Sequence, residues 1–225
     1  MRILALDSSG PACSAAFWTE GGVRAARFEA LARGHAERLL PMVLEVMAEA
    51  GTALDKVDLF AATTGPGGFT GVRVGLAALR GLALAAGRPM LGVTSFVALA
   101  HATTAEERAG RRLLVVIDSK RAELFVQSFG ADLAAESDGM LMTPGTIAER
   151  YAGQPLLLAG DGSARVIAAL EVLGCKLRTA AGASFVDAAV LAALAAGRAS
   201  EARREPPAAC YLHPPATTPP APRQR

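Results

Sequence analysis

The sequence predicts an α/β fold of two lobes, each with a mixed sheet flanked by helices, and three observations support this fold class. First, three short apolar strands joined by tight turns occupy residues 2–28, which is typical of an antiparallel meander. Second, helices and strands alternate from residue 35 to residue 93, which predicts parallel strands with helical crossovers. Third, an apolar strand followed by Asp-Ser and a turn occurs at residues 4–9 and again at 115–119, which indicates an internal repeat.

The first lobe is expected over residues 1–104. Strands at 2–6, 13–18 and 23–28 form the meander, because Gly, Pro, Asp and Ser residues mark turns between them. The remaining elements are then a helix at 35–50, a strand at 57–64, a long Ala/Leu/Gly helix ending near residue 86, a strand at 89–93 and a helix at 94–102. These strands predict a mixed five-stranded sheet.

The second, smaller lobe is expected over residues 105–200. Its predicted elements are strands at 113–117, 124–129, 139–142 and 155–159 and helices after Thr143-Pro144, at 163–173 and at 184–196. Residues 201–225 form a tail that is expected to be largely extended or disordered. From residue 205 onward it holds seven of the thirteen prolines, and proline-rich segments form neither ladders nor helices.

Composition and charge exclude several classes of protein. The formal net charge is +2, and the tail alone carries four arginines against two glutamates, so the folded part is neutral and predicts no broad nucleic-acid footprint. Cys13, Cys175 and Cys210 have no CxxC spacing, which favours free thiols in a reducing compartment. The apolar stretch at 76–86 is interrupted by Arg80 and is shorter than the ~20 residues of a membrane span. A cytoplasmic protein without a membrane segment is therefore expected.

The motif with the clearest local definition lies at residues 59–87, where a strand, a glycine turn and a long helix follow one another. This arrangement directs backbone N–H groups and the positive helix end toward an anion. The acidic turns and a second glycine turn at 160–162 could contribute to such a site, although each is also explained as a simple connection. The residues that could bind a nucleotide or another anion are Asp7, Ser8, Gly65, Gly67, Gly68, Asp118, Gly160 and Gly162.

Two expected ligand-binding features are missing from the sequence. No lysine follows the glycines of the first turn, so the motif is not a Walker loop. His35, His101 and His213 are widely separated, so no metal site is predicted.

The two predicted helices at 35–50 and 69–86 carry more apolar and small residues than a single sheet contact requires. The first has two apolar stripes, which favours burial on a second side against another helix or a partner chain. In the second, Gly71 and Gly75 recur with Ala78 on one side, and an interior glycine costs ~1 kcal/mol relative to alanine. Close approach of another helix would explain this spacing.

Several segments, in the right order over nearly the whole chain, closely resemble the TsaB (YeaZ) family. They are GPGGFTGVRVGLAALRGLALA at 65–85, the opening RILALDSS, HAERLLPMV at 35–43, IDSKRAELF at 117–125, LAGDG at 158–162 and Tyr211-Leu212. Together with the repeated lobes, the resemblance implies the two-lobed actin-like ATPase (ASKHA, RNase H-like) fold, with the second lobe reduced. The tail beyond Tyr211-Leu212 departs from the usual ending of the family.

The resemblance implies a non-catalytic subunit that binds and activates a TsaD-type subunit for threonylcarbamoyl transfer to the adenosine next to the anticodon of ANN-decoding tRNAs. In TsaD a His-x-x-x-His motif binds the metal, and Ser95 and Leu99 stand where these histidines would fall. The implied partners are a TsaD-type subunit, a TsaE-type ATPase and a second copy of the chain, with tRNA contacted only indirectly. No cofactor is required, although ATP or ADP could bind at the partner junction.

In the family the two long helices pair with the same helices of the partner. Carried over to this chain, the predicted interface consists of Leu39, Met42, Val43, Val46, Met47, Gly71, Val72, Gly75, Ala78 and Leu79.

Three other functions are alternatives to that of a non-catalytic subunit. The first is a stand-alone ATPase or kinase of the same fold that uses Asp7 or Asp118. The second is a catalytic carbamoyltransferase or metalloenzyme, which the missing histidine pair disfavours. The third is a direct tRNA-binding protein, which the neutral charge of the folded part disfavours. Its candidate residues are Arg73, Arg80, Arg111, Arg112 and the arginines of the tail.

Overall fold

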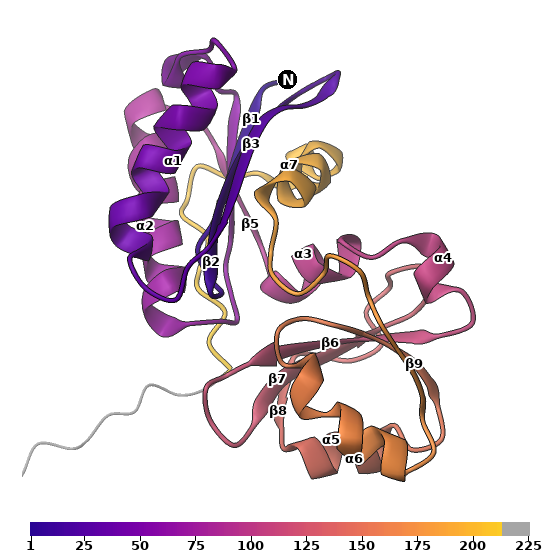
Figure 1. The fold of residues 1–225 in the computed structure, drawn as a ribbon. Helices are drawn as coiled ribbons and strands as arrows, with labels where there is room; N and C mark the ends of the chain where they lie inside the picture. The colour runs from indigo at the N-terminus through magenta and orange to yellow at the C-terminus, as the bar shows by residue number, and fades with distance from the viewer. Residues whose placement is uncertain (213–225) are drawn as a thin grey trace, which may run out of the picture.

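The computed structural model describes residues 1–212, which form two lobes that each contain a five-stranded sheet (Figure 1). The strands of the first lobe are β1 (Ile3–Asp7), β2 (Ala12–Thr19), β3 (Gly22–Ala30), β4 (Leu59–Thr63) and β5 (Met90–Val93), and those of the second are β6 (Arg112–Asp118), β7 (Leu124–Phe129), β8 (Met140–Met142), β9 (Pro155–Ala159) and β10 (Lys176–Thr179). The helices are α1 (His35–Glu49), α2 (Phe69–Ala86), α3 (Ser95–His101), α4 (Ala105–Arg108), α5 (Pro144–Arg150), α6 (Ile167–Val172) and α7 (Ala188–Gly197), with short 3-10 turns η1 (Leu54–Lys56), η2 (Ser163–Arg165) and η3 (Ala199–Glu201).

The two sheets repeat one topology, which confirms the predicted internal repeat and the mixed sheets. The first has the order β3-β2-β1-β4-β5, and the second has the order β8-β7-β6-β9-β10 when read in the same direction. In each, the first strand pairs antiparallel with the strand that follows it and parallel with the fourth. The reduction of the second lobe concerns its helices, since α5 and α6 have 7 and 6 residues where α1 and α2 have 15 and 18.

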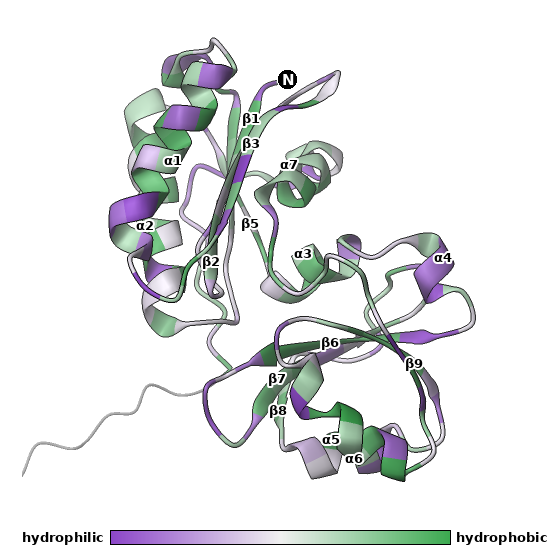
Figure 2. Cartoon of the chain, in the orientation of Figure 1, coloured by the Kyte–Doolittle hydropathy of each residue, from purple (hydrophilic) through white to green (hydrophobic). Residues whose placement is uncertain are grey.

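Both faces of the first sheet are covered. In β1, Leu4 and Leu6 face the cluster formed with α1 and α2, whereas Ile3 and Ala5 face the cluster formed with α7. This alternation follows from the period of two along a strand, and a strand buried on both faces reads as a continuous apolar run. Figure 2 shows α7 as apolar along most of its length, as this buried position requires.

The position of α7 corrects the predicted boundary between the lobes. This helix follows the second lobe in sequence but packs on the first sheet, where Leu191 and Ala195 are fully buried. Buried Ser14 of β2 anchors its start, because the Ser14 hydroxyl donates to Val186 O at 3.1 Å and accepts from Ala188 N at 3.0 Å. The second lobe therefore ends near residue 186, and the chain then returns to the first.

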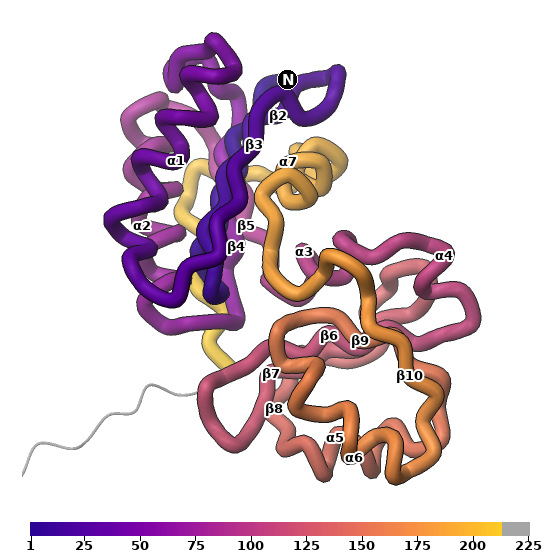
Figure 3. Tube along the Cα trace, in the orientation of Figure 1, coloured from indigo at the N-terminus to yellow at the C-terminus, as the bar shows by residue number. Residues whose placement is uncertain are grey.

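The predicted extended tail is ordered in its first part. Residues 203–212 run beside the edge of the first sheet (yellow in Figure 3), where Arg203 and Met90 exchange two backbone hydrogen bonds. The disorder predicted for the remainder, and His213, lie outside the described residues. Strand β10 and helix α4 were not predicted.

By length and composition, α2 is the one helix among residues 1–212 that could cross a membrane. Its packing is that of a helix lying on a sheet. Leu79 and Ala83 are buried in the first-lobe core, while Arg73 and Arg80 are exposed on the outer side.

Candidate functional site between the lobes

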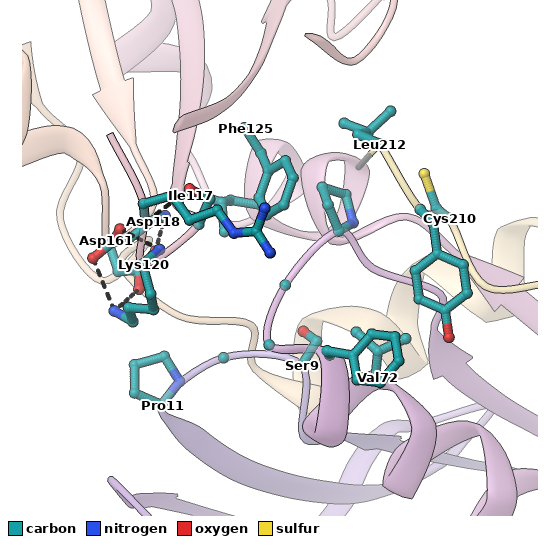
Figure 4. Close-up of a pocket in the computed structure, with 18 of the residues that line it drawn as sticks. Ser9, Pro11, Val72, Ile117, Asp118, Lys120, Phe125, Asp161, Cys210 and Leu212 are labelled. Atoms are coloured by element: carbon teal, nitrogen blue, oxygen red, sulfur yellow. Dashed lines mark hydrogen bonds and ion pairs between the residues drawn. The ribbon is translucent and has the colours of Figure 1, made fainter. Parts of the chain in front are cut away.

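A cleft of about 700 Å³ lies where the turn after β1 faces the turn after β6 (Figure 4). The first lobe contributes Ser9, Gly10, Pro11, His35, Gly67, Gly68, Phe69, Val72 and Arg73, the second lobe contributes Ile117, Asp118, Lys120, Arg121, Phe125 and Asp161, and the C-terminal segment contributes Cys210, Tyr211 and Leu212. The sequence predicted a site at these turns, and the topology brings them together because β1 and β6 are equivalent strands of the repeat.

Asp7 and Ser8 do not line this cleft. Asp7 is 1% exposed, and its carboxylate accepts hydrogen bonds from the Thr63 hydroxyl and from Ser9 N at 3.2 Å. Burial raises the pKa of Asp7, although these hydrogen bonds act in the opposite direction. The Ser8 hydroxyl donates to Gly71 O at 2.9 Å. The carboxylate expected to serve a stand-alone ATPase or kinase is thus enclosed by its own chain, which removes the geometric basis for Asp7 in that alternative.

Contacts within the chain or the backbone conformation require glycine at positions 65 and 67 of the first turn. A Cβ on Gly67 would lie 2.2 Å from Ser9 O, and Gly68 N donates to the same oxygen at 2.7 Å. Gly65 has a φ of +92°, and a Cβ there would lie 3.3 Å from Cys210 O. Gly67 and Gly68 reach the cleft, whereas Gly65 is buried beneath it.

The acidic residues of the second lobe are paired with its own cations (Figure 4). Asp118 accepts from Lys120 Nζ at 2.9 Å and from Arg165 Nη1 at 2.7 Å, and Asp161 accepts from Asp118 N at 2.9 Å. Burial opposes ionisation of Asp118, but the bonds from Lys120 and Arg165 outweigh it and lower the pKa of this carboxyl. Burial raises the pKa of Asp161. The two carboxylates therefore face cations that already neutralise them.

Gly160 and Gly162 lie against Val116 of β6 and do not line the cleft. Gly160 has a φ of +95°, and a Cβ there would lie 2.2 Å from Val116 O. A Cβ on Gly162 would lie 2.9 Å from Val116 Cγ1. Lys120, Arg165 and Asp161 were missed as site residues, although the Gly-Asp-Gly sequence and the lysine two residues after Asp118 were visible signals.

The predicted partner-interface residues are corrected by their burial. Leu39, Met42, Val43, Val46 and Met47 of α1 are at most 4% exposed, and Val72, Gly75 and Leu79 of α2 are also buried, while Gly71 and Ala78 are partly buried. All of these residues lie on the sides of α1 and α2 that pack against the first lobe, so they are unavailable to a partner in this conformation. The exposed apolar side chains of the same helices are Leu40 at 45%, Leu44 at 58% and Leu84 at 79%.

The glycine spacing in α2 has the same intrachain explanation. A Cβ on Gly71 would lie 2.0 Å from Ser8 O, and a Cβ on Gly75 would lie 3.0 Å from Ser8 Oγ. The close approach that the glycines permit is therefore to the turn after β1.

The residues at the metal-ligand positions of the TsaD motif have structural roles here. Ser95 is buried and its hydroxyl donates to Ser9 Oγ at 3.2 Å, and Leu99 is part of the core beneath α3. His35 Nε2 lies 2.9 Å from Gly10 O. Within residues 1–212, no three His, Cys, Asp or Glu side chains form a group that could hold a metal ion.

Comparison with known proteins identifies the family. The family model described as "TsaD: tRNA N6-adenosine threonylcarbamoyltransferase" matches residues 21–136. The Escherichia coli tRNA threonylcarbamoyladenosine biosynthesis protein TsaB is 40% identical over 132 residues, which are 59% of this chain and 56% of that protein. The chain thus spans about half the length of the curated relatives it matches.

Two solved structures extend the comparison over nearly the whole fold. YeaZ from Pseudomonas aeruginosa matches with a TM-score of 0.73 and 31% identity over 90% of this chain and 96% of its own. An activator of 2-hydroxyisocaproyl-CoA dehydratase from Clostridium difficile matches at a TM-score of 0.54 and 9% identity, over 89% of this chain and 96% of its own, and shows the fold alone, which is that of the actin-like ATPases. By the family model, the sequence identity and the structural match, the chain belongs to the TsaB (YeaZ) family.

Proposed function

We propose that this chain is a non-catalytic subunit that binds and activates a TsaD-type subunit, which transfers threonylcarbamoyl to the adenosine next to the anticodon of ANN-decoding tRNAs. The proposal is carried by Ser95 and Leu99, which stand where the resemblance to TsaD places the two metal-binding histidines. A serine hydroxyl already bonded to Ser9 and a leucine in the core cannot serve as two imidazole ligands.

The proposed partner surface is the outer face of α1 and α2, defined by Leu40, Leu44 and Leu84. Leu40 and Leu44 lie one turn apart on α1, Leu84 lies on α2, and the two helices contact each other. Large exposed aliphatic side chains on adjacent helices favour an interaction site. A second copy of the chain could use the same surface, and a TsaE-type ATPase would join the assembled complex. The tRNA would be contacted through the partner, because the folded part is neutral. The complex would act in the cytoplasm.

No cofactor is proposed for the chain itself. The groups of its candidate phosphate-binding turns are bonded within the chain, since Gly68 N donates to Ser9 O at 2.7 Å and Arg165 Nη1 donates to Asp118 at 2.7 Å. Any ATP or ADP would instead bind at the junction with the partner.

Reconstitution tests this function. Modified tRNA is measured with a TsaD-type subunit, a TsaE-type ATPase and a supply of threonylcarbamoyl-adenylate, with and without this chain. We expect modification to depend on the chain. Leu44→Asp is expected to weaken assembly at least about tenfold while changing the free energy of unfolding by no more than about 0.5 kcal/mol, because Leu44 is exposed.

Val43→Asp is the matched control on the neighbouring position. Val43 is fully buried, so an unpaired charge there is expected to unfold the chain rather than act on assembly alone. Full modification without the chain would refute the proposed activation. Unchanged assembly of the folded Leu44→Asp and Leu84→Asp variants would refute the proposed surface.

A further inference from the structure

The C-terminal segment of residues 203–212, here called the strap, follows the edge of the first sheet (Figures 1 and 3). Arg203 N donates to Met90 O at 2.9 Å, Met90 N donates to Arg203 O at 2.7 Å, and Cys210 N donates to Thr64 O at 2.7 Å. A Cβ on Gly92 would lie 2.5 Å from Pro207 Cβ, so only glycine admits the strap at this point. The strap is thus attached to the first lobe by its backbone and by close packing.

The last two residues of the strap contact opposite sides of the cleft. Tyr211 lies against the start of α2, where its hydroxyl accepts from Arg73 Nε at 3.0 Å and its ring centre is 5.8 Å from that of Phe69. Leu212 packs against the second-lobe core that contains Phe96, and a Cβ on Gly139 would lie 3.3 Å from Leu212 Cδ1. Two consecutive residues therefore connect the lobes across the cleft.

The place of this connection gives it a mechanical consequence. Within residues 1–212 the chain also passes between the lobes at the start of α3, where Ser95 N donates to Gly65 O at 2.8 Å, and again at residues 180–187. The strap meets the second lobe close to the first of these passages, because Leu212 packs beside Phe96 of α3. Two passages of the chain leave the lobes free to rotate about a hinge. Because Cys210, Tyr211 and Leu212 line the cleft, a rotation that widens the cleft would have to break the contacts of Tyr211 or those of Leu212. We propose that the strap is a latch that fixes the angle between the lobes and the opening of the cleft.

The contacts of the latch can be released without unfolding either lobe. Tyr211 is 47% exposed, and Arg73, which holds its hydroxyl, is exposed on α2. Segments held by a few partly exposed contacts open locally at low free-energy cost. A ligand or partner that engages Arg73 would therefore compete with Tyr211 and release the strap. The inference does not depend on the proposed function.

Cys210 provides a direct measurement of latch opening in the full-length chain. Cys13 and Cys175 are buried, whereas Cys210 is partly exposed and belongs to the strap. We expect Leu212→Ala and Tyr211→Ala each to increase the rate of reaction of Cys210 with a disulfide reagent such as DTNB by about fivefold to tenfold, because less apolar contact then opposes opening. Tyr211→Phe, which keeps the ring and loses only the bond from Arg73, should give a smaller increase.

Two controls accompany the measurement. Cys210→Ser should remove the signal, and Leu173→Ala, at an exposed position of the second lobe outside the cleft, should leave the rate unchanged. Equal rates for the wild type and both strap variants would overturn the inference.

The angle between the lobes is the second readout. Spin labels on Glu37→Cys of α1 and Glu149→Cys of α5, in a Cys210→Ser background, report the distance between exposed positions of the two lobes. Leu212→Ala should broaden and lengthen this distance distribution. Faster thiol reaction with an unchanged distribution would show a loose segment that does not hold the lobes, and would also overturn the inference.

Discussion

Gly71 and Gly81 of α2 differ in what surrounds them. Substituting each by alanine therefore distinguishes the effect of packing on the free energy of unfolding from the effect of helix propensity. Gly71 is pressed against Ser8 O, whereas a Cβ on Gly81 would meet no atom within 4 Å. Gly71→Ala is therefore expected to lower the free energy of unfolding by about 1–3 kcal/mol through overpacking. Gly81→Ala is expected to raise it by up to about 1 kcal/mol, because alanine is the better helix former.

Urea unfolding of the two glycine variants measures this contrast. Equal effects at the two positions would contradict the assignment of the Gly71 contact to the turn after β1. The sequence showed that some close approach was needed at this helix, but it could not show that the approaching residue, Ser8, lies 63 positions earlier in the same chain.

Asp7 gives stability a dependence on pH with a definite sign. Burial raises its pKa in the folded state above the value of about 3.9 in an unfolded chain. The folded state then holds the proton more tightly, so its contribution to stability is present at low pH and is lost as pH rises from about 4 through the folded pKa. Asp7→Asn, which keeps the shape without the charge, should remove this part of the pH dependence.

Urea unfolding of wild type and Asp7→Asn at a series of pH values from 4 to 8 checks the expectation. Thr63→Val serves as a comparison, because it removes a hydrogen bond that favours the charged carboxylate and should steepen the dependence. An Asp7→Asn variant whose stability falls with pH as steeply as that of the wild type would exclude Asp7 as the source.

At the scale of elements, most of the first lobe could be predicted because its patterns are strong. The meander, β4, α2 and β5 follow from apolar runs bounded by Gly, Pro and Asp, and the structure has them within one or two residues of their predicted ends. Strand β10 was missed because its sequence, KLRT, is polar and lies at a sheet edge, where no apolar alternation is required.

The direction in which each helix faces was the least predictable feature. Both apolar stripes of α1 were recognised, but the sequence does not distinguish a stripe that faces the sheet from one that faces outward. In the structure the stripe of Leu39, Met42 and Val46 is buried, whereas the predicted stripe of Leu40, Val43, Leu44 and Met47 is divided. Its Val43 and Met47 are buried, and its Leu40 and Leu44 are exposed. Only the three-dimensional arrangement decides which residues of a stripe are available to a partner.

At the candidate site, features formed by neighbouring residues could be predicted, whereas contacts between residues far apart in sequence could not. The turns at Asp7, Gly67, Asp118 and Asp161 were all identified, because each is a local signal after a strand. The ion pair between Asp118 and Arg165 was not, since these residues lie 47 positions apart in sequence. Tyr211 and Leu212 also line the cleft, but the composition of the tail predicted only an extended chain there.

At the scale of the whole molecule, the return of α7 means that the first lobe is not a continuous segment. Without α7, one face of the first sheet would expose Ile3, Ala5, Leu59 and Leu91, which are now at most 4% exposed. Burial of such side chains contributes roughly 1.5–3 kcal/mol each for the larger ones, which is a large part of the stability of a small domain. The predicted unit of residues 1–104 should therefore fail to fold alone.

A fusion that restores α7 tests this directly. Residues 1–104 are expected to show no cooperative urea transition, whereas the same segment joined through a flexible linker to residues 186–202 should regain one. Trp18, the single tryptophan, packs at the α7 face and reports docking through its fluorescence. A fusion carrying Leu191→Asp should behave like the bare fragment, because this side chain is fully buried against the sheet. Cooperative unfolding of residues 1–104 with native Trp18 emission would instead restore a boundary at residue 104. In that case α7 would be an accessory of the first lobe, and its burial would not be needed for the first lobe to fold.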